Sequence, residues 1–482
     1  MGKKLALGDE PMYKFSDNQI KFEDFHQPVG LKMDRNNRWV KKAESIPWGE
    51  IEKRYAKLFT NRKGNVAKPL RLALGSCIIQ DEYGYSDEEI VLQIQENPYY
   101  QFFCGLPGYT LERPFDPSLM VYFRKRLTAE ILEDVNEMVI EKAKENKINN
   151  DDDDQSEPPQ NKGTMIIDAT CAPSNIKFPQ DTELLNEARE NTEKLIDKLH
   201  NPKDGKKPRT YRKTAHKNHL KIARKRKKTN KDIRKATGQQ LGYIRRNLDI
   251  IDTMLENGKE LSDKDFNRLS TIKQLYEQQK YMRDNRTHHV DDRIVSLSQP
   301  HIRPIVRGKA KAKVEFGAKL DISIVDGWTR LEKQSFDAYN ESATLIEAIE
   351  RYKQRTGSYP ERVLADKIYR NRDNLNFCKE LNIHLSGPAL GRPKKDEIRN
   401  KRQDYIDENE RIEVERKFSL AKRKCGMGMI MTKLPETAMH SIAMSIIILN
   451  LRKVLCTFFA RFYFLLYFRF SFLLVRKSAF VQ

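Results

Sequence analysis

The chain has 482 residues with 89 Lys and Arg against 68 Asp and Glu, a net charge of +21, so an acidic partner is expected, nucleic acid before a membrane surface. Its length allows two or three domains, and a hydrophobic content of 38% is enough for packed cores. The six cysteines form no CxxC pair, which argues against structural zinc and a disulfide framework and favours a reducing compartment.

The amino-terminal part, residues 30–147, is predicted to be an all-α domain. Within it, the segment 67–80, AKPLRLALGSCIIQ, is expected to have one apolar face. The next helix begins at Ser86, which has the spacing of a capping box with Glu89, and it ends at Pro98.

Residues 117–145 are predicted to form one long amphipathic helix. A cluster of aromatic residues before it is more typical of a core than of a platform for stacking nucleic-acid bases; its members are Tyr99, Tyr100, Phe102 and Phe103. A linker follows at residues 148–163. Its four successive aspartates are expected to be a solvated spacer rather than a metal site.

An α/β core is predicted over residues 164–450. Its first strand is the β-branched run TMIIDAT, which is expected to end on the carboxylate of Asp168. A later strand in VLADKIY ends at Asp366, and Glu415 lies on a helix beyond it. A connection as long as residues 181–295 is implausible as a bare loop, so these residues are predicted to be a helical insertion after the first strand.

Strands return after the insertion in HIRPIVRGK and KVEFGAKLDISIVDGW. Arg303 and Arg307 lie in or beside the first of these and are candidate phosphate contacts. Glu315 and Asp321 are expected to be exposed strand positions or partners of nearby lysines. Trp328 is expected to pack against the sheet.

The insertion contains a dense run of cations. Residues 205–228 hold twelve Lys or Arg and no acid, and the run ends in Lys225, Arg226, Lys227 and Lys228. It can be a solvated helix face, a phosphate-binding surface, or both, and the absence of acids favours contact with DNA. Such contact is expected to be independent of base sequence and weakened by salt.

The segment RIEVERKFSLAKRK, residues 411–424, places a glutamate among cations. On a helical wheel its buried face is predicted to consist of Val414, Phe418, Ala421 and Cys425. Arg411, Glu415 and Lys422 share a second stripe beside that face. An ion pair between Arg411 and Glu415, four residues apart, is the simpler interpretation.

Carboxylates that follow neighbouring strands converge at one edge of a sheet, and a later helix can add a third. Asp168, Asp366 and Glu415 are therefore predicted to bind Mg²⁺ or Mn²⁺, which prefer oxygen ligands. Two such ions can clamp the attacking and leaving oxygens of a phosphodiester, with Arg411 and Lys422 facing the DNA phosphate. Asp366 can equally be a simple helix cap.

Four segments, together spanning roughly residues 30–450, resemble bacterial DDE-type insertion-sequence transposases of the insertion sequence 5 / insertion sequence 4 superfamily. MIIDAT resembles the strand of the first Asp, and LADKIYRNRDN resembles the Ala-Asp-x-x-Tyr segment around the second. RIEVERKFSLAKRKCGM resembles the signature in which Arg, Glu and Lys are separated by three and six residues, here Arg411, Glu415 and Lys422. Residues 68–108 resemble the helical domain that precedes the catalytic core.

The resemblance implies an RNase H-like core, a mixed sheet flanked by helices, that cleaves and joins DNA at the ends of a mobile element with two divalent ions. It implies catalytic and metal-binding roles for Asp168, Asp366 and Glu415, and DNA contacts by Arg411, Lys422 and Tyr369. A homo-oligomer is expected because two element ends must be joined. No small-molecule cofactor is expected, and the bacterial cytoplasm, at the nucleoid, is the expected location.

Two departures leave a catalytically decayed, non-enzymatic DNA-binding relative as the alternative. The family signature has a tyrosine three residues before the Arg, and Glu408 stands there in this chain. The apolar tail, residues 451–482, is long enough to resemble a membrane span, but Arg461 and Arg469 interrupt it. A packing helix or an unselected tail is therefore favoured over a span.

Overall fold

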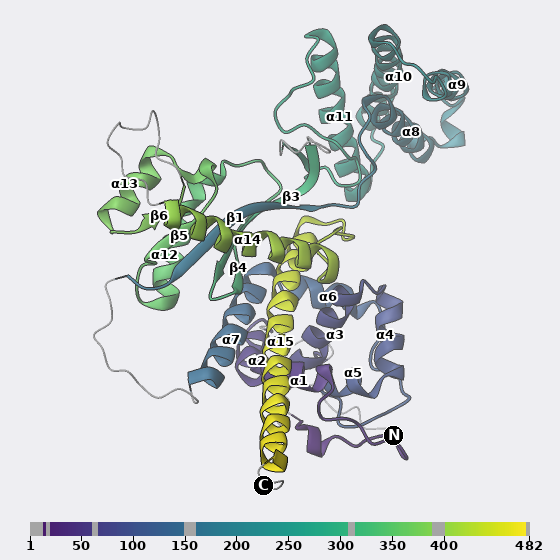
Figure 1. The fold of residues 1–482 in the computed structure, drawn as a ribbon. Helices are drawn as coiled ribbons and strands as arrows, with labels where there is room; N and C mark the ends of the chain where they lie inside the picture. Colours follow the sequence, from purple (N-terminus) through teal and green to yellow (C-terminus); the bar gives the residue numbers. More distant parts are fainter. Residues whose placement is uncertain are drawn as a thin grey trace, which may run out of the picture. The chain divides into compact units, whose positions relative to one another are not determined.

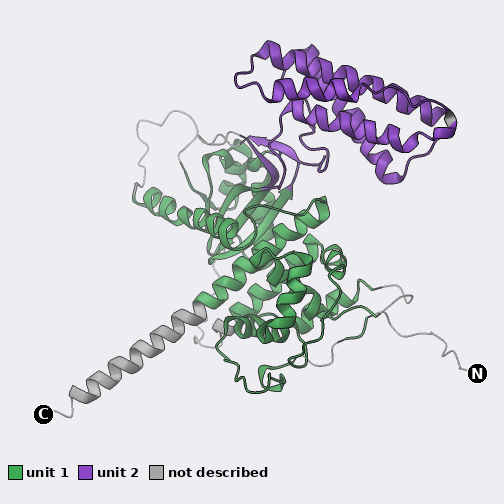
Figure 2. Cartoon of the chain, turned by 90° about the vertical axis from the view of Figure 1, so that its right-hand side faces the viewer, with its two compact units in different colours: residues 1–172, 320–334, 340–482 green, residues 173–319, 335–339 purple. Residues whose placement is uncertain are grey.

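The structure, a computed structural model, describes residues 13–15, 20–59, 66–148, 161–306, 314–387 and 401–478. The chain divides into two compact units (Figure 2). Unit 1 comprises residues 1–172, 320–334 and 340–482, and unit 2 comprises residues 173–319 and 335–339. The predicted amino-terminal helices and the strands around Asp366 thus belong to one unit, and the helical insertion forms most of the other.

The amino-terminal helices of unit 1 surround one buried helix. That helix, α3, is buried at every position from Leu70 to Gln80 rather than on one face, because neighbouring helices cover it on all sides. Ser86 caps α4 by accepting a hydrogen bond from the backbone N–H of Glu89, as predicted. The elements are η1 (Phe22–Asp24), α1 (Arg38–Ser45), α2 (Trp48–Ala56), α3 (Leu70–Tyr83), α4 (Asp87–Glu96), α5 (Pro98–Phe103), α6 (Leu119–Arg126) and α7 (Ala129–Ile148).

The predicted long helix at residues 117–145 is wrong, because the chain breaks into α6 and α7 at Leu127 and Thr128. Leu127 is fully buried, and its carbonyl oxygen accepts a hydrogen bond from Nδ1 of the buried His440, 2.6 Å away. A partner 313 residues away thus satisfies a carbonyl that an unbroken helix would have used itself. The aromatic cluster is a core as predicted, with Tyr100, Phe102 and Phe103 all buried.

A long apolar helix, α15 (Pro435–Ser478), completes unit 1 and packs against α7 and α3. Asn450 on α15 is fully buried and bonds the side chain of Asn136 and both backbone groups of Thr329, at 2.8–3.0 Å. Within the described residues one stretch, Pro435–Cys456, is apolar and long enough to cross a membrane, and 78% of an 18-residue window in it is buried inside the protein. Such burial is the pattern of a core helix.

The sheet has six strands in the order β2-β3-β1-β5-β6, with β4 also paired with β3. In unit 1, β1, β5 and β6 lie side by side and are parallel (Figure 1). β2 is antiparallel to the start of β3. The strands are β1 (Thr164–Pro173), β2 (Arg303–Val306), β3 (Val314–Val325), β4 (Trp328–Ser335), β5 (Arg362–Leu364) and β6 (His384–Leu385).

Helices flank this mixed sheet, which fits the predicted RNase H-like core. One face of the sheet packs on α12 and α13 through a cluster that includes Met165, Ile167, Val363 and Ala365. α12 ends at Gly357, whose φ of +81° permits a left-handed helix cap. The elements are η3 (Glu341–Thr344), α12 (Leu345–Thr356), η4 (Lys367–Tyr369), α13 (Arg372–Glu380) and α14 (Lys401–Lys424).

Unit 2 is largely helical and has its own apolar core (Figure 2). Helix α10 contacts the other three long helices, and the buried Asn247 on α10 bonds Thr192 on α8 at 2.9 Å. Its helices are α8 (Asp181–Leu199), η2 (Pro202–Asp204), α9 (Arg212–Ala223), α10 (Asn230–Glu256) and α11 (Asp263–Asp284).

Candidate active site

Asp168 lies on β1, and Asp366 lies two residues beyond the end of the neighbouring parallel strand β5. β1 runs on to Pro173, so the expectation that the strand ends on Asp168 is wrong, and this carboxylate comes from the middle of a strand. In the parallel register Ile166 is opposite Leu364, and each aspartate lies two residues further on. Adjacent strands are about 4.8 Å apart, so the register places the two residues next to each other.

The two aspartates also point to the same side of the sheet. Side chains alternate between the faces of a strand. The cluster under α12 and α13 contains Met165 and Ile167 from β1. It also contains Val363 and Ala365 from the neighbouring segment. Asp168 and Asp366 therefore project from the opposite face.

Asp366 combines the two roles that the sequence left open. Its side chain accepts a hydrogen bond from the backbone N–H of Lys367 at 2.7 Å, which caps η4. It also faces the guanidinium of Arg411, with Nη1 3.9 Å from Oδ1. The Asp366 side chain is 54% exposed, so it keeps access to solvent and to a ligand.

Helix α14 is attached to the sheet by Asp407. This carboxylate is 4% exposed and accepts hydrogen bonds from Arg362 on β5 at 2.9 Å and from Gln403 at 2.8 Å. Nε2 of His384 on β6 lies 3.0 Å from its second oxygen. Arg362 also binds Glu410 at 2.9 Å. These contacts fix the rotation of α14 over β5 and β6.

The rotation of α14 brings Arg411 and Glu415 to the aspartates. They lie four and eight residues after Asp407 and so face the same side of the helix. The predicted buried face is confirmed, since Val414, Phe418, Ala421 and Cys425 are all at most 7% exposed. Glu415 is exposed. Arg411 forms its ion pair with Asp366 and not with Glu415, the partner in the simpler interpretation.

Electrostatics indicate that the three carboxylates share one region. Burial raises the pKa of Asp168 to about 6. The backbone N–H of Ala169, 2.8 Å away, and the charge of Arg411 oppose this rise, whereas the charges of Asp366 and Glu415 add to it. A cation bound among these groups would relieve the repulsion between them.

These residues suit a hard divalent cation by their chemistry, since all three candidate ligands are carboxylates. Within the described residues, however, no three His, Cys, Asp or Glu side chains are close enough together to hold an ion. Arg411 supplies positive charge at this place by pairing with Asp366. Cation binding would therefore require the carboxylates to draw closer and Arg411 to yield part of its contact.

Replacing Asp168 with Asn is expected to stabilise unit 1 at neutral pH. Because the folded state raises the pKa of Asp168 from 3.8 to about 6, it holds this proton more tightly than the unfolded chain. The resulting stability is present below pH 3.8 and is lost as the pH rises through 6. Asp168→Asn should therefore gain about 1–2 kcal/mol over the wild type at pH 7.5 and little at pH 4.

Urea unfolding followed by tryptophan fluorescence measures this gain, because Trp39, Trp48 and Trp328 all lie in unit 1. Asp373→Asn, an exposed site on α13, is the control and should show the same difference from the wild type at both pH values. An Asp168→Asn protein that is less stable than the wild type at pH 7.5 would contradict the prediction.

Two pockets lie along α14. One, of about 310 Å³, is lined by Asp366, Arg411 and Glu408, so the acid that replaces the signature tyrosine faces the same space as Asp366. The other, of about 600 Å³, is lined by Lys422 together with Arg124 on α6. Arg411 and Lys422 thus open onto different pockets of unit 1, one on either side of Glu415 along the helix.

The residues predicted to contact DNA differ in their exposure to solvent. Tyr369 is fully buried in the core under the sheet, so the prediction that it contacts DNA is wrong. Arg303 is 19% exposed and donates to the carbonyl oxygen of Pro300, which makes it a structural residue of unit 2. Arg307 lies outside the described residues. The four cations from Lys225 to Lys228 are exposed, as a phosphate-binding surface requires.

The two acids that the sequence set apart from the site were expected to be exposed or to pair with nearby lysines. Glu315 is half-buried, and Asp321 is fully buried rather than exposed. The carboxylate of Asp321 accepts a hydrogen bond from Oγ1 of Thr344, and pairing of either acid with a lysine stays a prediction. Trp328 is 3% exposed and packs in the core as predicted. Asp407, Arg362 and His384 were not among the predicted site residues. Asp407 precedes Arg411 and Glu415 at helical spacing, but this spacing does not mark it as buried.

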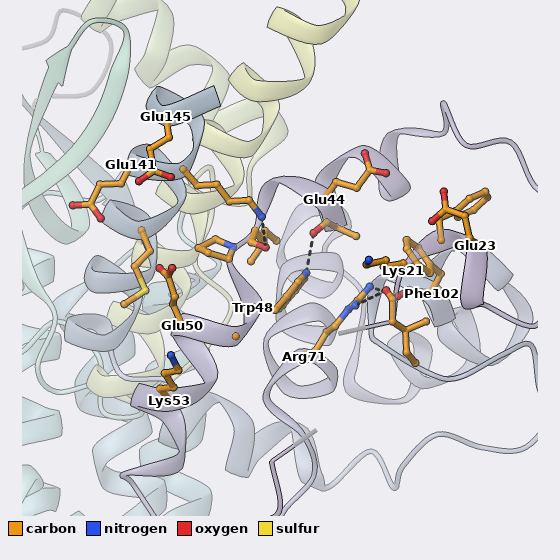
Figure 3. A pocket seen from close by; sticks show the side chains of 18 of the residues that line it. Lys21, Glu23, Glu44, Trp48, Glu50, Lys53, Arg71, Phe102, Glu141 and Glu145 are labelled. Atoms are coloured by element: carbon orange, nitrogen blue, oxygen red, sulfur yellow. Dashed lines mark hydrogen bonds between the residues drawn. The ribbon is translucent and has the colours of Figure 1, made fainter. Parts of the chain in front are cut away.

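A further pocket in the amino-terminal helices, of about 750 Å³, contains none of the predicted site residues (Figure 3). The guanidinium of Arg71 lies 5.3 Å and 5.2 Å from the ring centroids of Trp48 and Phe102. Arg71 donates to the carbonyl oxygens of Phe102 and Phe103, so its charge serves the fold. The rim carries both signs of charge, including Glu44, Glu50, Lys53, Glu141, Lys142 and Glu145. It has no preference for phosphate.

Comparisons with known proteins match both ends of unit 1. A family model described as "Transposase DDE domain" matches residues 363–452, which include Asp366 and Glu415, and "Transposase domain (DUF772)" matches residues 29–126. "Uncharacterized protein ORF8 in nfe locus" of Rhizobium meliloti is 31% identical over 145 residues, 30% of this chain and 66% of that protein. No solved structure matches the chain significantly. Two separate segments of the chain thus resemble transposase domains, which supports a bacterial DDE-type transposase.

Proposed function

We propose that this chain cleaves DNA at the ends of an insertion sequence and joins them to target DNA, with Asp168, Asp366 and Glu415 at the reacting phosphate. The observation that carries the proposal is the shared charge environment of these carboxylates, which come from distant parts of the sequence. Asp366 follows β5, the strand parallel to the β1 strand of Asp168. Arg411 pairs with Asp366, and the charges of Arg411, Asp366 and Glu415 all act on Asp168. Members of the family bind DNA and generally use divalent metal ions.

The three carboxylates would hold two Mg²⁺ or Mn²⁺ ions. When bound, these ions supply charge that activates a water or 3′-hydroxyl nucleophile and stabilises the leaving oxygen. The chain's own part is to bring three anionic ligands, two from the sheet region and one from α14, to the same region of unit 1. The raised pKa of Asp168, about 6, leaves this carboxyl largely ionised at neutral pH and therefore able to bind a cation.

Arg411 and Lys422 would orient the DNA. Arg411 presents a planar guanidinium that can form two parallel hydrogen bonds to a phosphate. In this structure Arg411 pairs with Asp366. On binding, a DNA phosphate would replace Asp366 as the partner of Arg411, and a metal ion would replace Arg411 as the partner of Asp366. Lys422, almost two helical turns beyond Glu415, would bind a phosphate further along the strand.

The basic insertion would hold DNA without reading its bases. Lys225, Arg226, Lys227 and Lys228 are all exposed between α9 and α10. A homo-oligomer is proposed because two element ends have to be processed together, and the bacterial cytoplasm, at the nucleoid, is the proposed location. The burial of most of Pro435–Cys456 inside the protein argues against a membrane partner.

Cleavage is expected to require a divalent cation. Purified protein should nick a duplex that carries the element end with Mg²⁺ or Mn²⁺, and should be inactive with EDTA. Without DNA, Mg²⁺ should raise the thermal midpoint of unit 1, because it binds the folded state. Asp366→Asn should lose that rise, whereas the control Asp404→Asn, on the same pocket, should keep it.

Nicking that persists in EDTA would overturn the metal-dependent mechanism. DNA binding without nicking under any of these metal conditions would instead favour the decayed, non-enzymatic relative.

A further inference from the structure

Positive charge in this protein is concentrated in one part of unit 2. Residues 205–246 contain seventeen Lys or Arg and one acid, Asp232, a net charge of +16 against +21 for the whole chain. Ion pairs engage three of these cations, Lys207, Arg212 and Lys225. In the described part of the chain, the other cations of this segment have no carboxylate within ion-pair distance. Their charge is therefore available to a ligand.

A tyrosine gathers two of these cations at one place. The ring of Tyr211 has the guanidiniums of Arg209 and Arg246 at 4.5 Å and 4.6 Å from its centroid. Arg209 precedes α9 and Arg246 lies on α10, so the ring joins two segments of the chain. Tyr211 is 39% exposed and has a φ of +55°, a conformation that bulky residues rarely adopt. The contact pre-orders two cations at the surface.

Beside this cluster, helix α10 has a surface position, Gly242, that no neighbouring atom covers. It contains two glycines, which weaken a helix. A β-carbon at Gly238 would lie 3.1 Å from the Arg283 guanidinium, so that glycine makes room for a neighbour on α11. Gly242 is exposed, and a β-carbon there would have nothing within 4 Å. Packing within unit 2 therefore does not explain Gly242.

The bare position lies on the cationic face. Arg245 and Arg246 follow Gly242 by three and four residues and are both exposed, so the three share one side of α10. A glycine flanked by arginines lets a polyanion come against the helix backbone while the guanidiniums reach its phosphates. Duplex DNA has the required density of phosphates, one charge per about 1.7 Å of its axis.

We propose that Arg209, Tyr211, Gly242, Arg245 and Arg246 seat the sugar–phosphate backbone of duplex DNA, which approaches α10 most closely at Gly242. The inference rests on the proposed function, since it takes DNA as the partner. It adds a defined surface, distinct from the lysine-rich turn at Lys225–Lys228 and from the carboxylates of unit 1.

The test measures binding of the full-length chain to a labelled duplex of about 30 base pairs by fluorescence anisotropy, in EDTA, across a salt series. The double variant Arg245→Gln/Arg246→Gln should weaken binding about tenfold or more and lower the salt slope by about 2. Gly242→Leu should also weaken binding several-fold, because a side chain then keeps the phosphates away. It should not unfold unit 2, because the space at this position is open.

Thr253→Leu is the matched control, since it adds the same side chain to an exposed position of α10 about three turns away. It should bind DNA like the wild type. Helical circular dichroism should be retained in all the variants.

Wild-type affinity in both the double variant and Gly242→Leu would overturn the proposed surface. If the variants bound DNA like the wild type but no longer bound vesicles of anionic lipid, the surface would be assigned to a membrane. That result would equally overturn the proposal. Binding is measured without metal, so a negative result in this binding test says nothing against the carboxylate mechanism. Conversely, cleavage that needs no metal would overturn that mechanism but not the proposed DNA-binding surface.

Discussion

Asp168→Asn, Asp366→Asn and Glu415→Gln are each expected to lower DNA strand cleavage by on the order of 10³-fold or more while leaving DNA affinity within about threefold. Each change removes one anionic ligand but keeps the size and hydrogen-bonding shape of the side chain. Metal affinity depends on the assembled set, so the loss in the double variants should be much less than the product of the single losses. Rates of nicking on an element-end duplex with Mg²⁺ measure the effect, and anisotropy measures affinity.

Glu413→Gln is the matched control for Glu415→Gln, because it lies two residues away on α14 and has its own ion pairs with Arg416 and Lys417. It should cleave at nearly the wild-type rate. Full activity in any one of the three site variants would remove that residue from the proposed site, and full activity in all three would remove the mechanism.

Asp407→Ala is expected to destabilise unit 1 by about 3 kcal/mol, which lowers its thermal midpoint by roughly 5 °C. The change leaves Arg362 and Gln403 without a buried acceptor and frees His384 from α14. The helix that bears Glu415 then loses its fixed rotation over β5. Cleavage should therefore fall even at temperatures where unit 1 is still folded. Urea unfolding followed by tryptophan fluorescence gives the stability.

Glu410→Gln separates the buried anchor from the exposed one. Both acids bind Arg362 at 2.9 Å, but Glu410 is 40% exposed and Asp407 only 4%. Water can replace the contact of Glu410, so its loss should cost less than about 1 kcal/mol and leave cleavage intact. Equal effects of the two variants would show that Asp407 does not position α14.

Local sequence was enough for elements whose signals are short-range. The Ser86 cap and the buried face of α14 both follow from spacing within a few residues, and both are confirmed. The same reasoning failed where a distant partner intervened. The helix predicted at residues 117–145 breaks at Leu127, whose carbonyl oxygen accepts a hydrogen bond from the distant His440.

For the candidate site, the sequence supplied the three carboxylates and the stripe that joins Arg411 to Glu415, and the role of these residues stays a prediction. It could not supply the anchor. Nothing within a few residues of Asp407 marks it as buried, because its partners Arg362 and His384 come from two strands far earlier in the chain. It also misjudged Tyr369 and Asp321, whose burial is decided by the faces of the sheet.

The sequence by itself indicated where several helices begin and end and where positive charge accumulates, because each of these depends on neighbours along the chain. Only the tertiary structure decided that Asp366 follows a strand parallel to that of Asp168, that Arg411 pairs with Asp366, and that Gly242 lies bare beside Arg245 and Arg246. Register and burial are properties of segments brought together from distant parts of the chain, and local spacing carries no record of which segments meet.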